Sequence, residues 1–205
     1  MSASLLDRLE ERLKLALPGP EAQLKMSPRH PGRARPLTRD APPDVKHAAA
    51  LILLVPKDEG FFFPLTLRRP DLLHHPGQIS LPGGGLDRDE AHDAAALREA
   101  EEEIGVDPST VRLLGSLTPL YVIVSGFVVT PFVGVVSSRP EFRPEAREVA
   151  EIIEVPLSTL TDPARRKWGN RTREGFAIDY PYFEIDNHEV WGATAMMLSE
   201  FSELL

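Results

Sequence analysis

Cysteine is absent from the 205 residues of this chain. Its absence excludes disulfide bridges, zinc sites with thiolate ligands and cysteine nucleophiles. A chain without cysteine suits a reducing compartment, and we therefore expect a cytoplasmic protein.

Excess positive charge and long apolar runs are also missing. The formal net charge is −8, whereas a protein that binds DNA or RNA over its surface is normally basic. The longest apolar stretch, Ala48 to Pro56, is too short to span a bilayer, and charges interrupt the leucines at the start of the chain, unlike in a signal peptide. We expect neither nucleic acid nor membrane as partner. An acidic protein can still bind an anionic small molecule through a cation or a local basic patch.

Length and composition predict one domain over residues 1–205, with 42% hydrophobic residues to form its core. Leucines at helical spacing predict a first helix from about Ser4 to Ala16. Residues 26–43 are rich in proline and arginine and predict an extended arm, either solvated or folded as a basic flap over an anionic ligand. Residues 1–43 thus hold the helix and the arm, and residues 44–205 the core.

The core alternates between predicted strands and helices. Apolar and aromatic runs predict strands at 47–55, 61–67, 111–121, 127–136, 148–155 and 176–185. We expect a helix at about 90–103, followed by Gly105 in a left-handed conformation. A closing helix after Trp191 should bury Met197, Leu198, Phe201 and Leu205. Strands on either side of a central helix predict an α/β fold with a mixed sheet between helices.

The stretch GGGLDRDEAHDAAALREAEEEIGV, residues 83–106, gathers glutamates behind three glycines. Glu99, Glu102 and Glu103 stand at i, i+3 and i+4, so their carboxylates share one helix face and repel one another. Mg²⁺ or Mn²⁺ would turn this repulsion into shared attraction, and substrate phosphates could complete the metal shell. A solvated acidic face is the alternative that a bare run of glutamates favours.

The surroundings of the glutamates favour the cation. The three glycines allow close backbone approach, and Arg98 stands where it can pair with Glu90, two turns back. A phosphate-binding loop with Gly-Lys-Ser/Thr is excluded because that tripeptide is missing from the stretch. Asp87 and Asp89 are spaced as in a calcium loop, but the glycine that such a loop requires is missing too.

The same residues resemble the Nudix box. That motif is a glycine, five residues, Glu, seven residues, Arg-Glu, an apolar or small residue, any residue, Glu-Glu, any residue, Gly and an apolar residue. Every fixed position is matched here: Gly84, Glu90, Arg98, Glu99, Ala100, Glu102, Glu103, Gly105 and Val106. Only Ala100 is smaller than the usual aliphatic residue.

The resemblance implies a Nudix hydrolase with an α/β/α sandwich, whose catalytic core is residues 44–205. Such enzymes hydrolyse a nucleoside diphosphate linked to another group and use Mg²⁺ or Mn²⁺ as cofactor. A metal polarises phosphoryl oxygens and activates water, which suits this reaction. By the same resemblance, Glu90 and Arg98 form an ion pair that supports the loop.

The resemblance also implies roles for the acidic face. Glu99 and Glu103 would be the principal metal ligands, and Glu102 a further ligand or the base. The carbonyl of Gly83, the residue before the motif glycine, would join them.

A second resemblance lies upstream, in LTLRRPDLLHHPGQISLPGG, residues 65–84. It is similar to the sequence that precedes the Nudix box in coenzyme A pyrophosphatases. Matching positions are Leu65, Thr66, Arg68, Gly77, Pro82, Gly83 and Gly84. Departures are Pro64, Arg69, Leu73 and Leu81. Leu73 replaces an arginine that could contact a phosphate, a role open to Arg69, His74 or His75.

Stretches 125–134, 148–157 and 190–195 are similar to the same subgroup. The implied reaction is hydrolysis of coenzyme A, or an acylated or oxidised derivative, to adenosine 3′,5′-bisphosphate and 4′-phosphopantetheine or its acyl form. Glu102 or Glu148 would orient or deprotonate the attacking water. The phosphates would bind to Arg68 and Arg69, with Gly84 against the substrate.

Alternatives remain at each level. Glu148 could be a solvated strand end, and two adjacent arginines could be ordinary surface charge. The enzyme could act on ADP-ribose, NADH or a dinucleoside polyphosphate. A ligand-sensing Nudix module without catalysis is a further reading, but such a module is expected to have lost carboxylates of the box.

Overall fold

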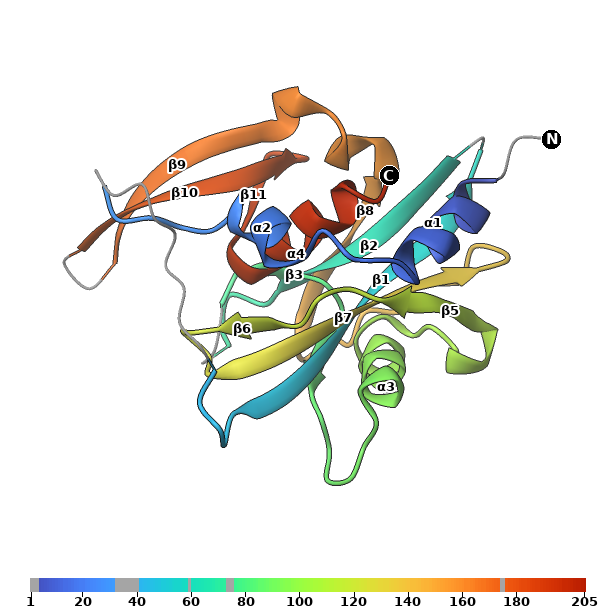
Figure 1. Ribbon diagram of the computed structural model, residues 1–205. Helices are drawn as coiled ribbons and strands as arrows, with labels where there is room; N and C mark the ends of the chain where they lie inside the picture. The colour runs from blue at the N-terminus through green and yellow to red at the C-terminus, as the bar shows by residue number, and fades with distance from the viewer. Residues whose placement is uncertain (1–3, 32–40, 59, 73–75, 174–175) are drawn as a thin grey trace.

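The computed structural model describes residues 4–31, 41–58, 60–72, 76–173 and 176–205 (Figure 1). The middle of the predicted arm, residues 32–40, lies outside the described residues, as do Leu73, His74 and His75. Every helix in the described part of the chain is too short or too polar to cross a membrane.

Helices and strands follow one another along the whole chain. The helices are α1 (Leu5–Leu13), α2 (Gly19–Leu24), α3 (His92–Ile104) and α4 (Gly192–Ser202). The strands are β1 (Lys46–Lys57), β2 (Gly60–Arg68), β3 (Ile79–Ser80), β4 (Gly83–Gly85), β5 (Val111–Ser116), β6 (Leu120–Val122), β7 (Phe127–Val136), β8 (Val149–Pro156), β9 (Arg166–Arg173), β10 (Phe176–Ile185) and β11 (His188–Trp191). Short 3₁₀ turns lie at Pro108–Thr110, Leu157–Leu160 and Pro163–Arg165.

The larger of two sheets is mixed, as the sequence predicts. Strands β3, β2, β1, β7 and β5 lie in that order, while β4 pairs with β1, β6 with β7 and β8 with β2. β1 runs parallel to β7, and the other pairings of this sheet are antiparallel. The smaller sheet is antiparallel in the order β11, β10, β9.

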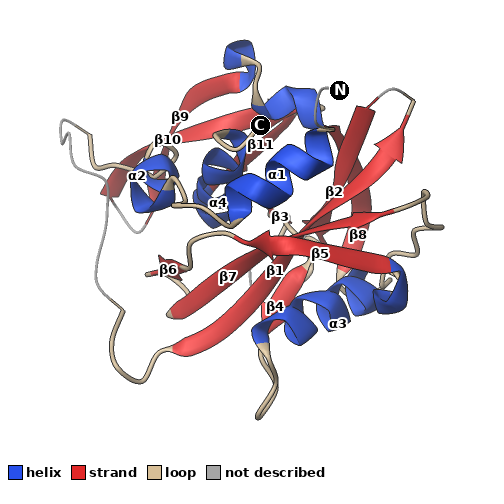
Figure 2. Cartoon of the chain, turned by 45° about the vertical axis from the view of Figure 1, so that its right-hand side comes forward, coloured by secondary structure: helices blue, strands red, loops and turns tan. Residues whose placement is uncertain are grey.

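Helices cover both faces of the larger sheet (Figures 1 and 2). One face of β1 shares a core with α1 and α4 through Ala50, Ile52 and Leu54. The opposite face packs with α3 through Ala49, Leu51, Leu53 and Val55. Successive residues of a strand point to opposite faces, so a continuous apolar run suits a strand covered on both sides. The predicted α/β/α sandwich is confirmed.

The edge of β1 is divided between two neighbours. Its last residues, 55–57, pair with β2, whereas Ala48, Ala49 and Ala50 pair with the glycines of β4. β2 pairs on its other edge with β8. The division brings β4 against the start of β1, and β4 also contacts α3.

Several predicted bounds are confirmed and others are corrected. β7 and β10 have the predicted bounds, and Gly105 ends α3 with φ 72°. One strand at 111–121 is wrong, because the register against β7 shifts around Gly115 and β6 begins only at Leu120. Glu90 lies before the first residue of α3, and Glu148 lies before that of β8.

Strands β3, β4, β9 and β11 and helix α2 have no counterpart among the predicted elements. β9 reads RKWGNRTR and lacks apolar alternation, so only its pairing with β10 makes it a strand. The three glycines of β4 resemble a loop in sequence, yet their backbone pairs with β1. Leu205 is partly exposed, and Leu204 takes the predicted place in the core.

The described start of the arm packs against the protein. Met26 and Ser27 are buried. Arg29 exchanges backbone hydrogen bonds of 2.8 and 2.9 Å with Asp179, and its guanidinium lies 5.1 Å from the ring centre of Trp168. A solvated arm is therefore wrong for this first part.

A buried carboxylate fastens the N-terminal segment to the closing helix. Glu200 of α4 has no exposed surface. Its Oε1 accepts hydrogen bonds from the amide of Gly19 and from the amide and hydroxyl of Thr118. Its Oε2 accepts one from Gln23. These donors replace the water that the carboxylate loses on burial.

Glu200→Gln should lower the free energy of unfolding by about 1–3 kcal/mol, because its amide NH₂ would face donors that need an acceptor. Glu203→Gln is the matched control: Glu203 follows the same helix and pairs at the partly exposed surface with Lys25, where losing an ion pair costs under about 1 kcal/mol. Urea denaturation measures both variants. Equal losses would contradict the structural role of Glu200.

Candidate active site

Several of the predicted site residues come together at the end of β1 that pairs with β4. Glu99 and Glu103 lie on α3, Arg68 ends β2, and Glu148 stands directly before β8. Nη1 of Arg68 lies 3.6 Å from Glu103 Oε1, and its Nη2 lies 3.4 Å from Glu148 Oε2. The amide of Gly83 donates to Glu103 at 3.3 Å. Residues far apart in sequence thus meet around Glu103.

The predicted ion pair between Glu90 and Arg98 is confirmed. Nε and Nη2 of Arg98 donate to the two oxygens of Glu90 at 2.8 and 3.0 Å. Glu90 also accepts the amide of Asp87 at 2.8 Å, and Arg98 reaches the carbonyl of Gly85 at 3.0 Å. The bonds from Arg98, and then the one from Asp87, lower the pKa of Glu90 to about 2. Glu90 therefore stays ionised and holds the loop between β4 and α3.

Glu103 carries the most buried carboxylate of the acidic face, with 7% of its side chain exposed. Burial raises its pKa to about 7, against the opposing effects of the Gly83 amide and of Arg68. The nearest groups that favour its charged form, at 3.3 and 3.6 Å, are too distant for strong hydrogen bonds. Among the described residues, the carboxylate is thus buried without a full complement of donors.

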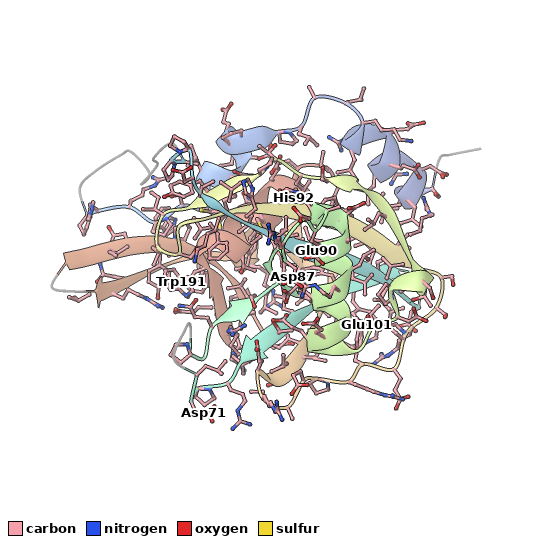
Figure 3. All side chains as sticks on the ribbon, turned by 90° about the horizontal axis from the view of Figure 1, so that it is seen from below. Asp71, Asp87, Glu90, His92, Glu101 and Trp191 are labelled. Carbon is pink, nitrogen blue, oxygen red and sulfur yellow. The ribbon has the colours of Figure 1, made fainter. Side chains whose placement is uncertain are left out.

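The other glutamates of the stretch differ from Glu103. Glu99 is largely buried and accepts from Arg98 at 2.9 Å; burial raises its pKa and Arg98 opposes the rise. Glu102 is 60% exposed and lies 3.4 Å from Arg98. Glu101 lies on the other side of α3 from Glu90 and is exposed (Figure 3). Of the three glutamates of the predicted acidic face, Glu99 and Glu103 are therefore largely buried, whereas Glu102 points to solvent.

Glu99 and Glu103 are the two carboxylates best placed to hold a cation. Within the described residues, no three carboxylate or imidazole groups stand close enough to hold a metal ion as they are. Carboxylate oxygens are nevertheless the hard ligands that Mg²⁺ and Mn²⁺ take, and Mg²⁺ usually adds water and substrate phosphates to one or two of them. The donor set, with one buried and incompletely paired carboxylate, fits such a cation.

The three glycines of β4 meet three different constraints. A Cβ on Gly83 would lie 2.4 Å from the carbonyl oxygen of Ala49 on β1. A Cβ on Gly84 would lie 2.5 Å from the carboxylate of Glu99. On Gly85 it would meet only the ring of Phe127, at an ordinary 3.6 Å. Gly83 thus protects the pairing of β4, and Gly84 makes room for Glu99.

A loop that the sequence does not reveal as part of the site positions Glu148. The amides of Arg143 and Glu145 donate to the carbonyls of Ile104 and Glu103 at 2.9 and 3.0 Å, which satisfies carbonyls at the end of α3. A Cβ on Gly105 would lie 2.9 Å from that of Arg143. Gly105, the one sequence signal for this contact, therefore allows the loop to dock close to α3.

The two predicted phosphate-binding arginines have different surroundings. A register shift between Leu67 and Arg68 interrupts the pairing of β2 with β8, and such a bulge re-aims a side chain. Arg68 consequently reaches Glu103 and Glu148. Arg69 instead forks onto the carboxylate of Asp71 at 2.9 Å and donates to the carbonyl of Ala146 at 3.2 Å.

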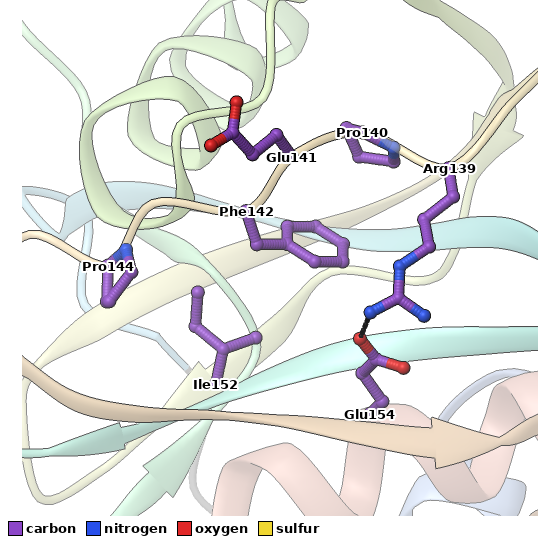
Figure 4. Close-up of a pocket in the computed structure, with 7 residues that line it drawn as sticks. All are labelled: Arg139, Pro140, Glu141, Phe142, Pro144, Ile152 and Glu154. Carbon is purple, nitrogen blue, oxygen red and sulfur yellow. Dashed lines mark hydrogen bonds and ion pairs between the residues drawn. The ribbon is translucent and has the colours of Figure 1, made fainter.

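A hollow of about 410 Å³ lies between the loop after β7 and β8 (Figure 4). Arg139, Phe142 and Ile152 line it, and Arg139 pairs with Glu154 beside it. Its lining includes no predicted site residue. The acidic face and this hollow are therefore separate features.

Comparison with known proteins gives matches along most of the chain. Residues 45–175 match the family model described as NUDIX domain. The chain is 34% identical to a protein of Photorhabdus laumondii over 77% of this chain and 84% of the relative. It is 37% identical to a protein of Yersinia enterocolitica over 77% and 80%. Each of the two is named an uncharacterized Nudix hydrolase NudL. A solved MutT protein from Methanosarcina mazei is 16% identical over 81% of this chain and 96% of that one, with a TM-score of 0.49.

Glu103→Gln should stabilise the metal-free protein by about 3 kcal/mol above pH 7. The folded pKa of about 7 exceeds the ordinary value of 4.5, so the folded state binds more protons than the unfolded state between these values. Wild-type stability should therefore fall as pH rises through this window, and glutamine, which cannot ionise, removes the fall. Denaturation in EDTA at pH 5 and pH 8 measures the effect. A difference between variant and wild type that is equal at both pH values would contradict it.

Proposed function

This chain belongs to the Nudix family and is a Nudix hydrolase, and on that premise we propose that it hydrolyses the pyrophosphate bond of coenzyme A or its derivatives. The products are adenosine 3′,5′-bisphosphate and 4′-phosphopantetheine or its acyl form. One observation carries the proposal. Arg68, an arginine of the coenzyme A pyrophosphatase pattern, ends β2 with its guanidinium between the carboxylates of Glu103 and Glu148.

In this proposal Glu99 and Glu103 hold Mg²⁺ or Mn²⁺, with Glu102 and the backbone of Gly83 as further ligands. The cation would supply polarisation of the phosphoryl oxygens and a lower pKa for the attacking water. Glu103 is suited to hold the cation because its buried carboxylate has only weak partners. A cation would supply the positive charge that this carboxylate lacks. Gly84 has no side chain, so it leaves room beside the backbone for the carboxylate of Glu99. The substrate would bind next to that carboxylate.

Glu148 is our first choice for the residue that orients or deprotonates water, with Glu102 as the alternative. Half of the Glu148 side chain is exposed, and it faces Glu103 across Arg68. The loop hydrogen bonds to the end of α3 fix its backbone relative to the metal ligands. Glu102 lies on the same helix as those ligands, but its side chain is mostly exposed and its contact with Arg98 is 3.4 Å long.

In this proposal, Arg68 and Arg69 bind different phosphate groups of the substrate. Arg68, beside the carboxylates, serves the diphosphate that is cleaved. Arg69 serves the 3′-phosphate that distinguishes coenzyme A from ADP-ribose and NADH, because a planar fork matches a phosphate bidentately. Its ion pair with Asp71 is exposed, and exposed ion pairs are worth under about 1 kcal/mol. Replacing Asp71 by a phosphate as the partner of Arg69 would therefore cost little free energy.

A second candidate is a Nudix pyrophosphatase acting on ADP-ribose, NADH or a dinucleoside polyphosphate. Leu73, in place of an arginine, favours it, because one contact to the 3′-phosphate would then be missing. A ligand-sensing module is disfavoured, since every carboxylate of the box is present.

With Mg²⁺ or Mn²⁺, coenzyme A should be turned over with a kcat/KM roughly tenfold or more above those of ADP-ribose and NADH, because a bidentate phosphate contact is worth more than about 1.4 kcal/mol. Dephospho-coenzyme A, without the 3′-phosphate, should fall between them. Chromatographic separation of products measures each rate. Fastest turnover of ADP-ribose would reject the coenzyme A assignment. Glu103→Gln is the control for the metal role and should lower kcat by roughly a hundredfold or more.

Gly84→Ala should weaken Mn²⁺ binding roughly tenfold while the protein stays folded, because the new methyl group displaces only the flexible end of Glu99. Gly85→Ala is the matched control on the same strand and should bind Mn²⁺ as the wild type does. Electron paramagnetic resonance of free Mn²⁺ measures both affinities, and circular dichroism checks the fold. Unchanged Mn²⁺ affinity in Gly84→Ala would count against Glu99 as a ligand.

A further inference from the structure

Two arginines neutralise the carboxylates of the candidate site. Arg98 contacts Glu90, Glu99 and Glu102. Arg68 spans the other two, with one nitrogen toward Glu103 and one toward Glu148. Each guanidinium group thus contacts its own set of acidic residues. The two arginines differ in how tightly their contacts hold them.

Arg68 is held far more loosely than Arg98. Its contacts with the two carboxylates are 3.6 and 3.4 Å long, whereas Arg98 makes three bonds to Glu90 and Glu99 of 2.8–3.0 Å. Charge-assisted hydrogen bonds of arginine are normally 2.7–2.9 Å long. In addition, Nε of Arg68 is buried and has no hydrogen-bond partner among the described residues. The guanidinium is thus attracted to both carboxylates by charge, but short hydrogen bonds do not fix its position.

The backbone of Arg68 is fixed while its side chain is poorly paired. Its amide donates to the carbonyl of Gln78 at 2.9 Å, and its side chain is 22% exposed. An unpaired buried N–H costs free energy that a new acceptor would recover. Rotation of the side chain toward a phosphate oxygen would supply that acceptor without moving β2.

We propose that Arg68 is a displaceable counter-ion, which stands between Glu103 and Glu148 in the metal-free protein and yields these carboxylates when a divalent cation binds. The inference rests on the proposed metal role of Glu103. A buried carboxylate needs a nearby positive charge, and a divalent cation provides more of it than a guanidinium. The two cations repel each other, so they cannot both keep full contact with Glu103. The released guanidinium turns to the substrate diphosphate.

This exchange couples metal binding to phosphate binding. Metal entry frees Arg68 for a phosphate, and a phosphate that holds Arg68 leaves Glu103 open to the metal. Such coupling is reciprocal, so each ligand strengthens the binding of the other. Arg68 is then a phosphate-binding residue as well as a local counter-charge.

The test is a titration with Mn²⁺ alone, without nucleotide, on wild type, Arg68→Gln and Arg69→Gln. Free Mn²⁺ is measured by electron paramagnetic resonance. Arg68→Gln should bind Mn²⁺ roughly fivefold to tenfold more tightly than wild type, because the competing guanidinium is gone. Arg69→Gln is the matched control: it removes the same charge one residue away, from a side chain paired with Asp71, and should change the affinity by less than about twofold.

Unchanged or weaker Mn²⁺ binding in Arg68→Gln overturns the inference, and so does equal tightening in Arg69→Gln, which would indicate a general field effect. Arg68→Lys keeps the charge but cannot span two carboxylates with a planar fork. It should give an intermediate Mn²⁺ affinity, and it carries the test if Arg68→Gln does not fold.

Steady-state kinetics add a second readout. Arg68→Gln should raise KM for coenzyme A by a larger factor than it lowers kcat, because it loses a phosphate contact. The two proposals can fail separately. A wild type that hydrolyses coenzyme A, with no difference in Mn²⁺ affinity between the variants, removes this inference alone. Tighter Mn²⁺ binding in Arg68→Gln supports it even if another nucleotide proves to be the substrate.

Discussion

The close approach of β4 to β1 and α3 is the constraint on which the site depends. Gly83 leaves no space for a side chain against the backbone of β1, and Gly84 leaves none against Glu99. Any other residue at these positions would separate the strand from its neighbour or push the carboxylate away. Because β4 lies so close to α3, the amide of Gly83 reaches the carboxylate of Glu103. The acidic face of α3 therefore lies against the backbone of β4 as well as against the side chains of Arg68 and Arg98.

Two buried glutamates show what distinguishes a structural carboxylate from one suited to a cation. Glu200 receives four hydrogen bonds from surrounding donors, and its burial joins the N-terminal segment to α4. Within the part of the chain that the structure describes, Glu103 receives one long bond from an amide and faces one distant guanidinium. The first arrangement satisfies the charge within the fold. The second leaves the charge incompletely satisfied, at a cost in stability that functional sites commonly carry.

Local patterns in the sequence predict a large part of this structure. The continuous apolar run of β1 predicts a strand covered on both faces, and the Arg98–Glu90 pair follows from their spacing around one loop and helix. β9 and β4 escape prediction because their strand character comes from pairing partners and not from their own composition. The same holds for the docking of the 143–148 loop on α3, which depends on a contact between segments about forty residues apart. Predictions for Leu73 and for residues 32–40 fall outside the described residues.

The contrast between local and distant signals also explains why the reaction type is easier to infer than the substrate. The residues proposed to hold the cation lie within one strand, loop and helix, so a single motif specifies them. Recognition of a substrate needs groups from several segments; those in our proposal are Arg68 and Arg69 at the end of β2 and Gly84 of β4. The position of Arg68 depends on a register shift against β8, and no sequence pattern predicts that shift. A pattern can therefore identify Arg68 as important, but only the fold brings it to the carboxylates of Glu103 and Glu148.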